Sequence, residues 1–182
     1  MMDYDIKEPF VVKPVPGGEA GVRGSAITMA AKGKKSGDID GGAPGNMKGA
    51  DKQFQLMYYQ SAIMSPRDPQ SGLPTGQRMH MGVEVVGRNC KGVPLLWNVI
   101  STNETLTSVV INFWSQHGAG AGVTQAIYYY VTLTNASIAT MEHMTSEIDG
   151  TLFFRARLTY QKIEWNWKQG GITATDDWIG AD

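Results

Sequence analysis

Apolar and polar residues alternate along much of this chain, which is the pattern of β-strands with one buried face. In the clearest stretch, residues 152–160, Phe154 and Leu158 fall on one face, and Arg155 and Arg157 fall on the other. Similar segments predict further strands at residues 25–31, 53–59, 79–86, 107–114, 126–134 and 137–143. We expect the strand at 152–160 to run on through the aromatic residues 163–167.

A helix and two long loops interrupt the predicted strands. Residues 94–100 have helical spacing, and Pro94 suits a first helical turn because its missing N–H costs nothing there. Residues 32–50 are too rich in glycine for regular structure, and residues 65–76 contain three prolines and two glycines. The sequence therefore predicts a mainly β protein: a small antiparallel β-barrel with one short flanking α-helix and long loops.

The length of 182 residues favours one well-buried core over two domains. Residues 1–24 mix charges with prolines and glycines and show no period, so we interpret them as an N-terminal arm. We assign residues 25–170 to the barrel domain and residues 171–182 to a C-terminal acidic tail.

The net charge and the cysteine content exclude several classes of protein. The formal net charge is −1, so no overall field draws the protein to nucleic acid or to an anionic membrane. Cys90 is the single cysteine, which excludes an intrachain disulfide and suits a reducing cytoplasm. The N-terminus begins with acidic residues, and no run of ~18 apolar residues occurs, so we expect neither a Sec-type signal nor a membrane span.

The sequence shows no set of residues spaced for catalysis, for a cofactor or for a metal. His80, His117 and His143 lack metal-ligand spacing, and we interpret them as polar positions on strands or in a loop. Cys90 precedes Lys91, a cation that could lower its pKa, but no Cys-His signature surrounds it. We predict that the protein is not an enzyme.

Two charged clusters can be interpreted either as solvent-exposed segments without a function or as binding segments. Residues 32–36, Lys-Gly-Lys-Lys-Ser, form either a solvated basic cluster or a contact patch for an acidic surface of a neighbouring subunit. Asp176, Asp177 and Trp178 form either a solvated tail or a docking segment with the tryptophan as its anchor.

Several segments, taken in order, resemble one family. Residues 91–96 read Lys-Gly-Val-Pro-Leu-Leu, residues 159–165 read Thr-Tyr-Gln-Lys-Ile-Glu-Trp, and residues 173–178 read Thr-Ala-Thr-Asp-Asp-Trp. They resemble the Lys-x-Ser-Pro-x-Leu helix start, the Ser-Tyr-x-Lys-Ile-Glu-Trp strand and the Ser/Thr-x-Asp-Asp-Trp ending of the Hcp family, the tube proteins of the bacterial type VI secretion system. The matching residues are Lys91, Pro94, Tyr160, Lys162, Ile163, Glu164, Trp165, Asp176, Asp177 and Trp178.

The likeness covers residues 25–178 and departs from the family pattern at three places. Val93 replaces the usual serine, and both the N-terminal arm and the loop at 32–50 are longer than in a plain member. The longer arm and loop concern how rings stack and what lies at the ring face.

The resemblance implies a β-barrel whose six copies form a ring, with rings stacked into the inner tube inside a contractile sheath. Such a tube carries a spike at its tip and effectors in its lumen, and sheath contraction expels it. The implied partners are further copies of the chain, the sheath, a VgrG-like spike, the baseplate and effector proteins, with no nucleic acid and no membrane insertion. The protein is then cytoplasmic before firing and secreted afterwards without a signal peptide.

The resemblance also places the contacts between rings. We expect the extended loop at residues 62–77 to contact the next ring or subunit, and we expect the loop at 32–50 to contribute as well. The side chains that we assign to stacking are Arg67, Asp68, Gln70, Leu73, Lys34 and Lys35. The alternatives are an effector chaperone or exported binding module of this fold, and a tube protein of a related contractile injection system or phage tail.

Overall fold

The computed structural model describes residues 26–42, 49–117, 124–147 and 150–178. The strands are β1 (Ala26–Gly33), β2 (Gly37–Ile39), β3 (Phe54–Met64), β4 (Met79–Arg88), β5 (Leu106–His117), β6 (Thr124–Thr145), β7 (Leu152–Thr159), β8 (Lys162–Trp167) and β9 (Ile172–Asp177), and the helix is α1 (Val93–Ser101). The prediction of a mainly β protein with one short helix is confirmed.

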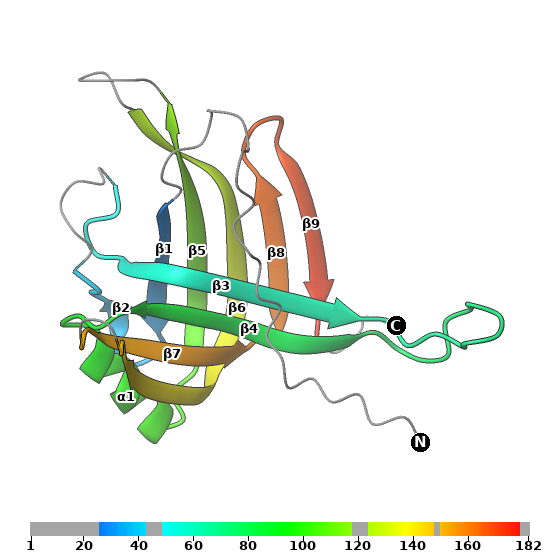
Figure 1. The fold of residues 1–182 in the computed structure, drawn as a ribbon, viewed down its shortest axis with the longest axis horizontal. Coiled ribbons are helices and arrows are strands. Elements are labelled where there is room, and N and C mark those ends of the chain that lie inside the picture. The colour runs from blue at the N-terminus through cyan, green and yellow to red at the C-terminus, as the bar shows by residue number, and fades with distance from the viewer. Residues whose placement is uncertain (1–25, 43–48, 118–123, 148–149, 179–182) are drawn as a thin grey trace.

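Six of the strands close into a ring. β1 pairs with β3, β3 with β4, β4 with β7, β7 with β6, β6 with β5, and β5 with β1, and every pair is antiparallel. β2 extends outward from β1, and β8 and β9 extend outward from β6 (Figure 1). The predicted antiparallel barrel is therefore present as a six-stranded ring with three strands outside it.

The long strand β6 differs from the prediction, because the expected strands at 126–134 and 137–143 form one continuous strand. β6 bends where Asn135 adopts a positive φ of 49°, and the facing chain breaks at residues 160–161. The Asn135 amide donates to Gln161 Oε1 at 2.8 Å across this bend. The expected uninterrupted strand over 152–167 is thus two strands, β7 and β8, which follow the two halves of β6.

The segment 32–50, predicted to be one long loop, contains a short hairpin. β2 pairs with the end of β1 in the register Ala31 to Ile39, and Gly37 at a φ of 66° permits the tight turn. The glycine content that argued against regular structure is here part of a β-turn. Residues 43–48 lie outside the described residues.

The core fills the ring and is built around two aromatic side chains. Phe54 on β3 and Phe154 on β7 are fully buried and pack edge to face, with ring centroids 6.0 Å apart. Gly87 and Gly92 approach these rings so closely that an added Cβ would lie 2.6 Å from Phe154 and 2.7 Å from Phe54. The backbone therefore meets the aromatic rings without a side chain between them.

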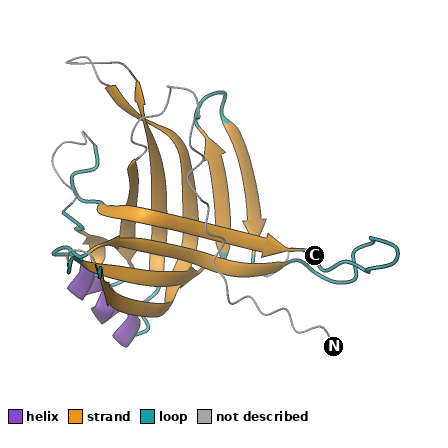
Figure 2. Ribbon diagram, in the orientation of Figure 1, coloured by secondary structure: helices purple, strands orange, loops and turns teal. Residues whose placement is uncertain are grey.

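Helix α1 lies at one corner of the strands (Figure 2). Val93, Leu96 and Val99 are its buried positions, spaced to form one apolar face. The Trp97 indole N–H donates to His143 Nε2 on β6 at 3.2 Å, which ties the helix to the bent strand. The part of the chain that the structure describes contains no helix long and apolar enough to cross a membrane.

Candidate functional site

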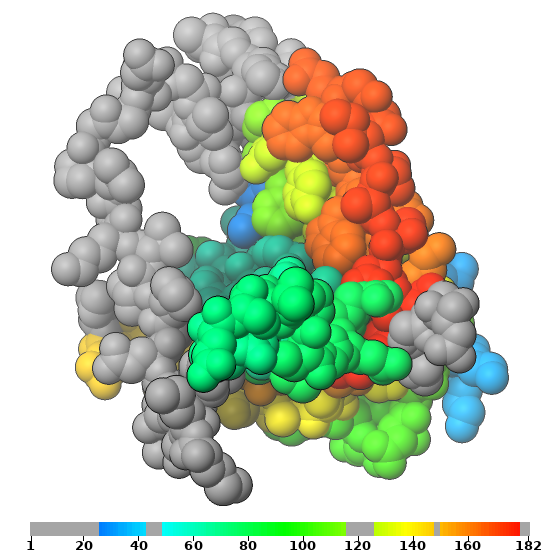
Figure 3. Space-filling model, turned by 90° about the vertical axis from the view of Figure 1, so that its right-hand side faces the viewer, coloured from blue at the N-terminus to red at the C-terminus, as the bar shows by residue number. Residues whose placement is uncertain are grey.

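A long loop, residues 65–78, joins β3 to β4 and projects from the barrel (Figure 1). The prediction placed its start at Ala62, but Ala62 and Met64 belong to β3. In Figure 3 the loop, in green, stands in front of the other elements and beside the red end of β9. This projection places the tip of the loop beyond the barrel wall.

Hydrogen bonds within the loop give it a defined shape. Arg67 and Pro74 form a β-bridge, and Thr75 N donates to Pro66 O at 3.0 Å. Asp68 N donates to Leu73 O at 2.9 Å. The outer part of the loop is therefore a small closed hairpin.

The carboxylate of Asp68 caps the turn at the tip. Its Oδ1 accepts hydrogen bonds from the backbone N–H groups of Gln70 at 2.7 Å and Ser71 at 3.2 Å. These bonds lower the pKa of the Asp68 carboxyl, because they stabilise its charged form. Leu73, a large apolar side chain, stands 64% exposed beside this turn.

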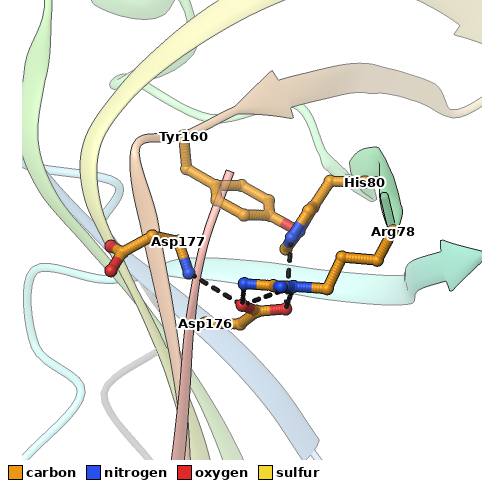
Figure 4. Close-up of polar contacts among 5 residues, drawn as sticks. All are labelled: Arg78, His80, Tyr160, Asp176 and Asp177. Atoms are coloured by element: carbon orange, nitrogen blue, oxygen red, sulfur yellow. Dashed lines mark hydrogen bonds and ion pairs between the residues drawn. The ribbon is translucent and has the colours of Figure 1, made fainter. Parts of the chain in front are cut away.

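At its root the loop is bound to the last strand. Arg78 Nε lies 2.7 Å from both carboxylate oxygens of Asp176 on β9, and its Nη2 donates to Oδ1 of the same carboxylate (Figure 4). Hydrogen bonds from Arg78 hold the pKa of the Asp176 carboxyl below its usual value, against the opposing effect of burial. A fork-shaped contact of this kind fixes orientation as well as distance.

His80, two residues further along, lies under this ion pair with its side chain fully buried. Its Nδ1 is 2.9 Å from the Tyr160 hydroxyl, and its Nε2 is 3.3 Å from Asp176 Oδ2. Trp178 stacks on the imidazole at 5.3 Å and meets the Tyr160 ring edge-on at 5.1 Å. Burial raises the pKa of the Tyr160 hydroxyl, which keeps it neutral and able to donate.

We call Arg78, His80, Tyr160, Asp176 and Trp178 the loop-root cluster. It corrects the interpretation of residues 176–178 as an exposed tail, because residues 172–177 form strand β9 and pair with β8 along their length. The same ending docks on the chain's own loop root, with the tryptophan as part of the anchor.

The other matching family residues have structural contacts. Lys91 Nζ lies 2.7 Å from Asp40 Oδ2, and the hydrogen bond from Lys91 lowers the pKa of the Asp40 carboxyl. Pro94 stands in the first turn of α1, as predicted. In β8, Ile163 is fully buried, whereas Lys162, Glu164 and Trp165 are half-buried; Asp177 is half-buried in β9.

Lys34 and Lys35 lie on a different turn from the projecting loop, the one between β1 and β2. The buried Glu104 holds this turn, since its Oε1 accepts from Lys35 N at 2.6 Å and from Ser36 N at 2.7 Å. These backbone bonds and the Ser36 hydroxyl lower the pKa of the Glu104 carboxyl. The two lysines are thus presented on a rigid turn, and the structure shows no contact between them and the described loop 65–78.

Among the described residues, the cysteine and the histidines considered as catalytic or metal-binding residues do not lie together in one site. Burial raises the pKa of the Cys90 thiol, contrary to the lowering that a neighbouring lysine could cause. His143 contacts Trp97, His80 belongs to the loop-root cluster, and the side chain of His117 lies outside the described residues. Over residues 26–42, 49–117, 124–147 and 150–178, no group of three or more His, Cys, Asp or Glu side chains could hold a metal ion.

The ion pair at the loop root predicts a pH dependence of stability. The pKa of Asp176 is lower in the folded protein than in the unfolded chain, so its contribution is present above the unfolded value of ~3.9 and is lost as pH falls through the folded value. We expect Asp176→Asn to lower the urea midpoint at pH 7 and to lower it by less at pH 3, where part of the contribution of the charge is already lost. An equal difference at both pH values would show that the charge of Asp176 contributes nothing.

The chain is similar in sequence to proteins of a known family. Residues 32–167 match the family model described as "Type VI secretion system effector, Hcp". The "Major exported protein" of Pseudomonas aeruginosa is 33% identical over 163 residues, which cover 82% of this chain and 93% of that protein.

Solved structures share the same fold. One, described as "Crystal structure of Hcp protein", has a TM-score of 0.75 at 24% identity and covers 85% of this chain and 100% of its own. The secreted protein Hcp3 from Pseudomonas aeruginosa has a TM-score of 0.69 at 26% identity and covers 86% of this chain and 100% of its own. With a family match over most of its length and a relative at 33% identity, the chain belongs to the Hcp family of the type VI secretion system.

Proposed function

We propose that this chain is a structural subunit of the inner tube of a type VI secretion system. Six copies form a ring, the rings stack into a tube, and contraction of a surrounding sheath expels the tube together with effectors in its lumen. The chain acts by assembly and not by catalysis. The projecting loop 65–78 with its fixed root is the observation that supports this function best.

A loop held in one shape suits a contact between rings. Its hairpin bonds and the Arg78–Asp176 pair order the loop before any partner arrives. Binding by a preordered segment avoids most of the entropy cost of fixing it at the moment of contact. Leu73 at the tip then enters an apolar site on the next ring, with Arg67 and Gln70 exposed beside it.

The surface around the loop root supports a contact there as well. Met64 and Met79 face each other across β3 and β4 at the start of the loop, and both are exposed, as is Met81. Flexible methionine side chains adapt to a partner surface of irregular shape. Lys34 and Lys35, held out by Glu104, offer a second contact for an acidic surface of a neighbouring subunit.

A tube built from this chain would also need partners inside it, around it and at its end. A closed ring of one kind of chain is built from repeated head-to-tail interfaces, and its inner wall surrounds the cargo. We propose effector proteins in the lumen, a sheath around the tube, and a VgrG-like spike and baseplate at its end. The protein resides in the cytoplasm before firing and reaches the outside with the tube.

The oligomeric state of the purified full chain tests this proposal. The chain has a mass of 19.8 kDa, so a six-membered ring has a mass of 6 × 19.8, or about 119 kDa. Native mass spectrometry should show this hexamer at micromolar concentration. A monomer that persists as concentration rises would overturn the proposal.

A further inference from the structure

One row of cross-strand side-chain pairs runs over five adjacent strands, and its last members are exposed to solvent. Ile27 on β1 pairs with Phe113 on β5, Phe113 with Tyr129 on β6, Tyr129 with Trp167 on β8, and Trp167 with Ile172 on β9. We call these five residues the aromatic row. Neighbouring rings along it touch, at 5.5 Å from Phe113 to Tyr129 and 6.3 Å from Tyr129 to Trp167.

The row leaves the core as it crosses the sheet. Ile27, Phe113 and Tyr129 pack against the core, but Trp167 is 42% exposed and Ile172 is 68% exposed. β8 and β9 lie outside the six-stranded ring (Figure 1), and although Ile163 on β8 is fully buried, the row reaches solvent at Trp167 and Ile172. Two large apolar side chains side by side at the end of a row mark a surface that something covers.

The outer edge of β9, next to the exposed end of the row, can also form backbone hydrogen bonds with a further strand. β9 pairs with β8 on one side, and among the described residues no strand pairs with its other side. Such an edge presents unpaired N–H and C=O groups to which an extended segment can add as a further strand. An extended segment bound there would lay alternate side chains against Ile172.

We propose that residues 10–13 of the same chain add to the outer edge of β9 and cover the exposed end of the aromatic row. The sequence there is Phe10-Val11-Val12-Lys13, which is apolar and β-branched. Pro9 and Pro14 bracket it, and proline is tolerated at the first residue of a strand and ends pairing beyond it. Phe10 and Val12 would then share the face that meets the row.

The connection to β1 makes this docking possible within one chain. The N-terminal segment enters the barrel at Ala26, next to Ile27, the first member of the row. From β1 to the far side of β9 the segment must cross five strand spacings, roughly 24 Å. Phe10 precedes Ala26 by 16 residues, which can span up to about 50 Å.

Hydrogen exchange of the full chain, read by mass spectrometry, tests this proposal. We expect the amides of residues 10–13 to exchange at least tenfold more slowly than in the unfolded chain, because they are paired with β9. Ile172→Ser together with Trp167→Ser should abolish this protection. Leu95→Ser, which changes an apolar residue 46% exposed on α1, is the matched control and should leave it intact.

A change in the segment itself separates docking from damage to the barrel. Phe10→Ser should also abolish protection of residues 10–13 and should speed exchange of the peptide that covers 172–177, while the β5 and β6 peptides stay unchanged. The proposal is overturned if residues 10–13 exchange as fast as in the unfolded chain. It is also overturned if their protection appears only as the protein concentration rises, since a second copy would then be the occupant.

Discussion

Phe154→Ala is expected to lower the free energy of unfolding by about 3–5 kcal/mol. Phe154 is fully buried, packs edge-on against Phe54, and lies against Gly87, which has no side chain of its own to fill the space that Phe154 leaves. A loss of this size is a large part of the ~5–15 kcal/mol that stabilises a typical domain. Urea unfolding of the variant measures it directly.

Phe153→Ala is the matched control, because it removes the same atoms from the adjacent residue on the opposite face of β7. Phe153 is half-buried, whereas Phe154 is completely enclosed. The control should cost less than half as much as Phe154→Ala. Equal losses for the two variants would contradict the placement of the core inside the six-stranded ring.

Shortening the projecting loop is expected to abolish stacking of rings and to leave the barrel folded. Pro66 O and Thr75 N are 3.0 Å apart, so residues 67–74 can be replaced by Asn-Gly, a pair that suits a tight two-residue turn. The loop-root cluster stays in place in this variant. Sedimentation velocity should show the hexamer without the larger stacks that we expect of the natural chain.

Two single substitutions refine this result. Leu73→Asp puts a charge on the exposed tip and should weaken stacking at least tenfold, because an ionised carboxylate would enter an apolar site. Leu95→Ser on α1 changes another exposed leucine away from the loop and should stack as the natural chain does. Stacks of normal length in the loop-shortened variant would show that the loop is not the contact between rings.

Alternation in the sequence was sufficient to predict the barrel strands, because a strand with one buried face carries a local signal of period two. The prediction was wrong where the chain bends. At Asn135 the buried positions shift phase, from Val131 and Leu133 to Ala136 and Ile138, yet β6 continues as one strand and its partner breaks at residues 160–161 instead. The short strand β2 carries too few residues to show any period.

The loop-root cluster could not be predicted from local pattern. Arg78 and Asp176 are 98 residues apart in sequence, and nothing near either one indicates its partner. Strict alternation would place His80 on the face opposite to Val83 and Val85. An irregular register near Gly82, which has a φ of 80°, turns His80 inward to the buried face instead.

The family motif carried information that the residue pattern lacked. It marked residues 176–178 as a unit, although their contacts are with the far-off loop root. The acidic character of this ending suggested solvent exposure, and the structure shows that one of its two carboxylates neutralises Arg78. A charged C-terminal segment can thus stabilise the fold from within when a residue far away in sequence supplies the opposite charge.

Electron microscopy of assemblies of the purified full chain tests the central claim most directly. We expect six-fold rings stacked along one axis, with density for residues 66–75 of one ring in contact with the next ring. Isolated monomers, or stacked rings whose loops point into solvent, would contradict it.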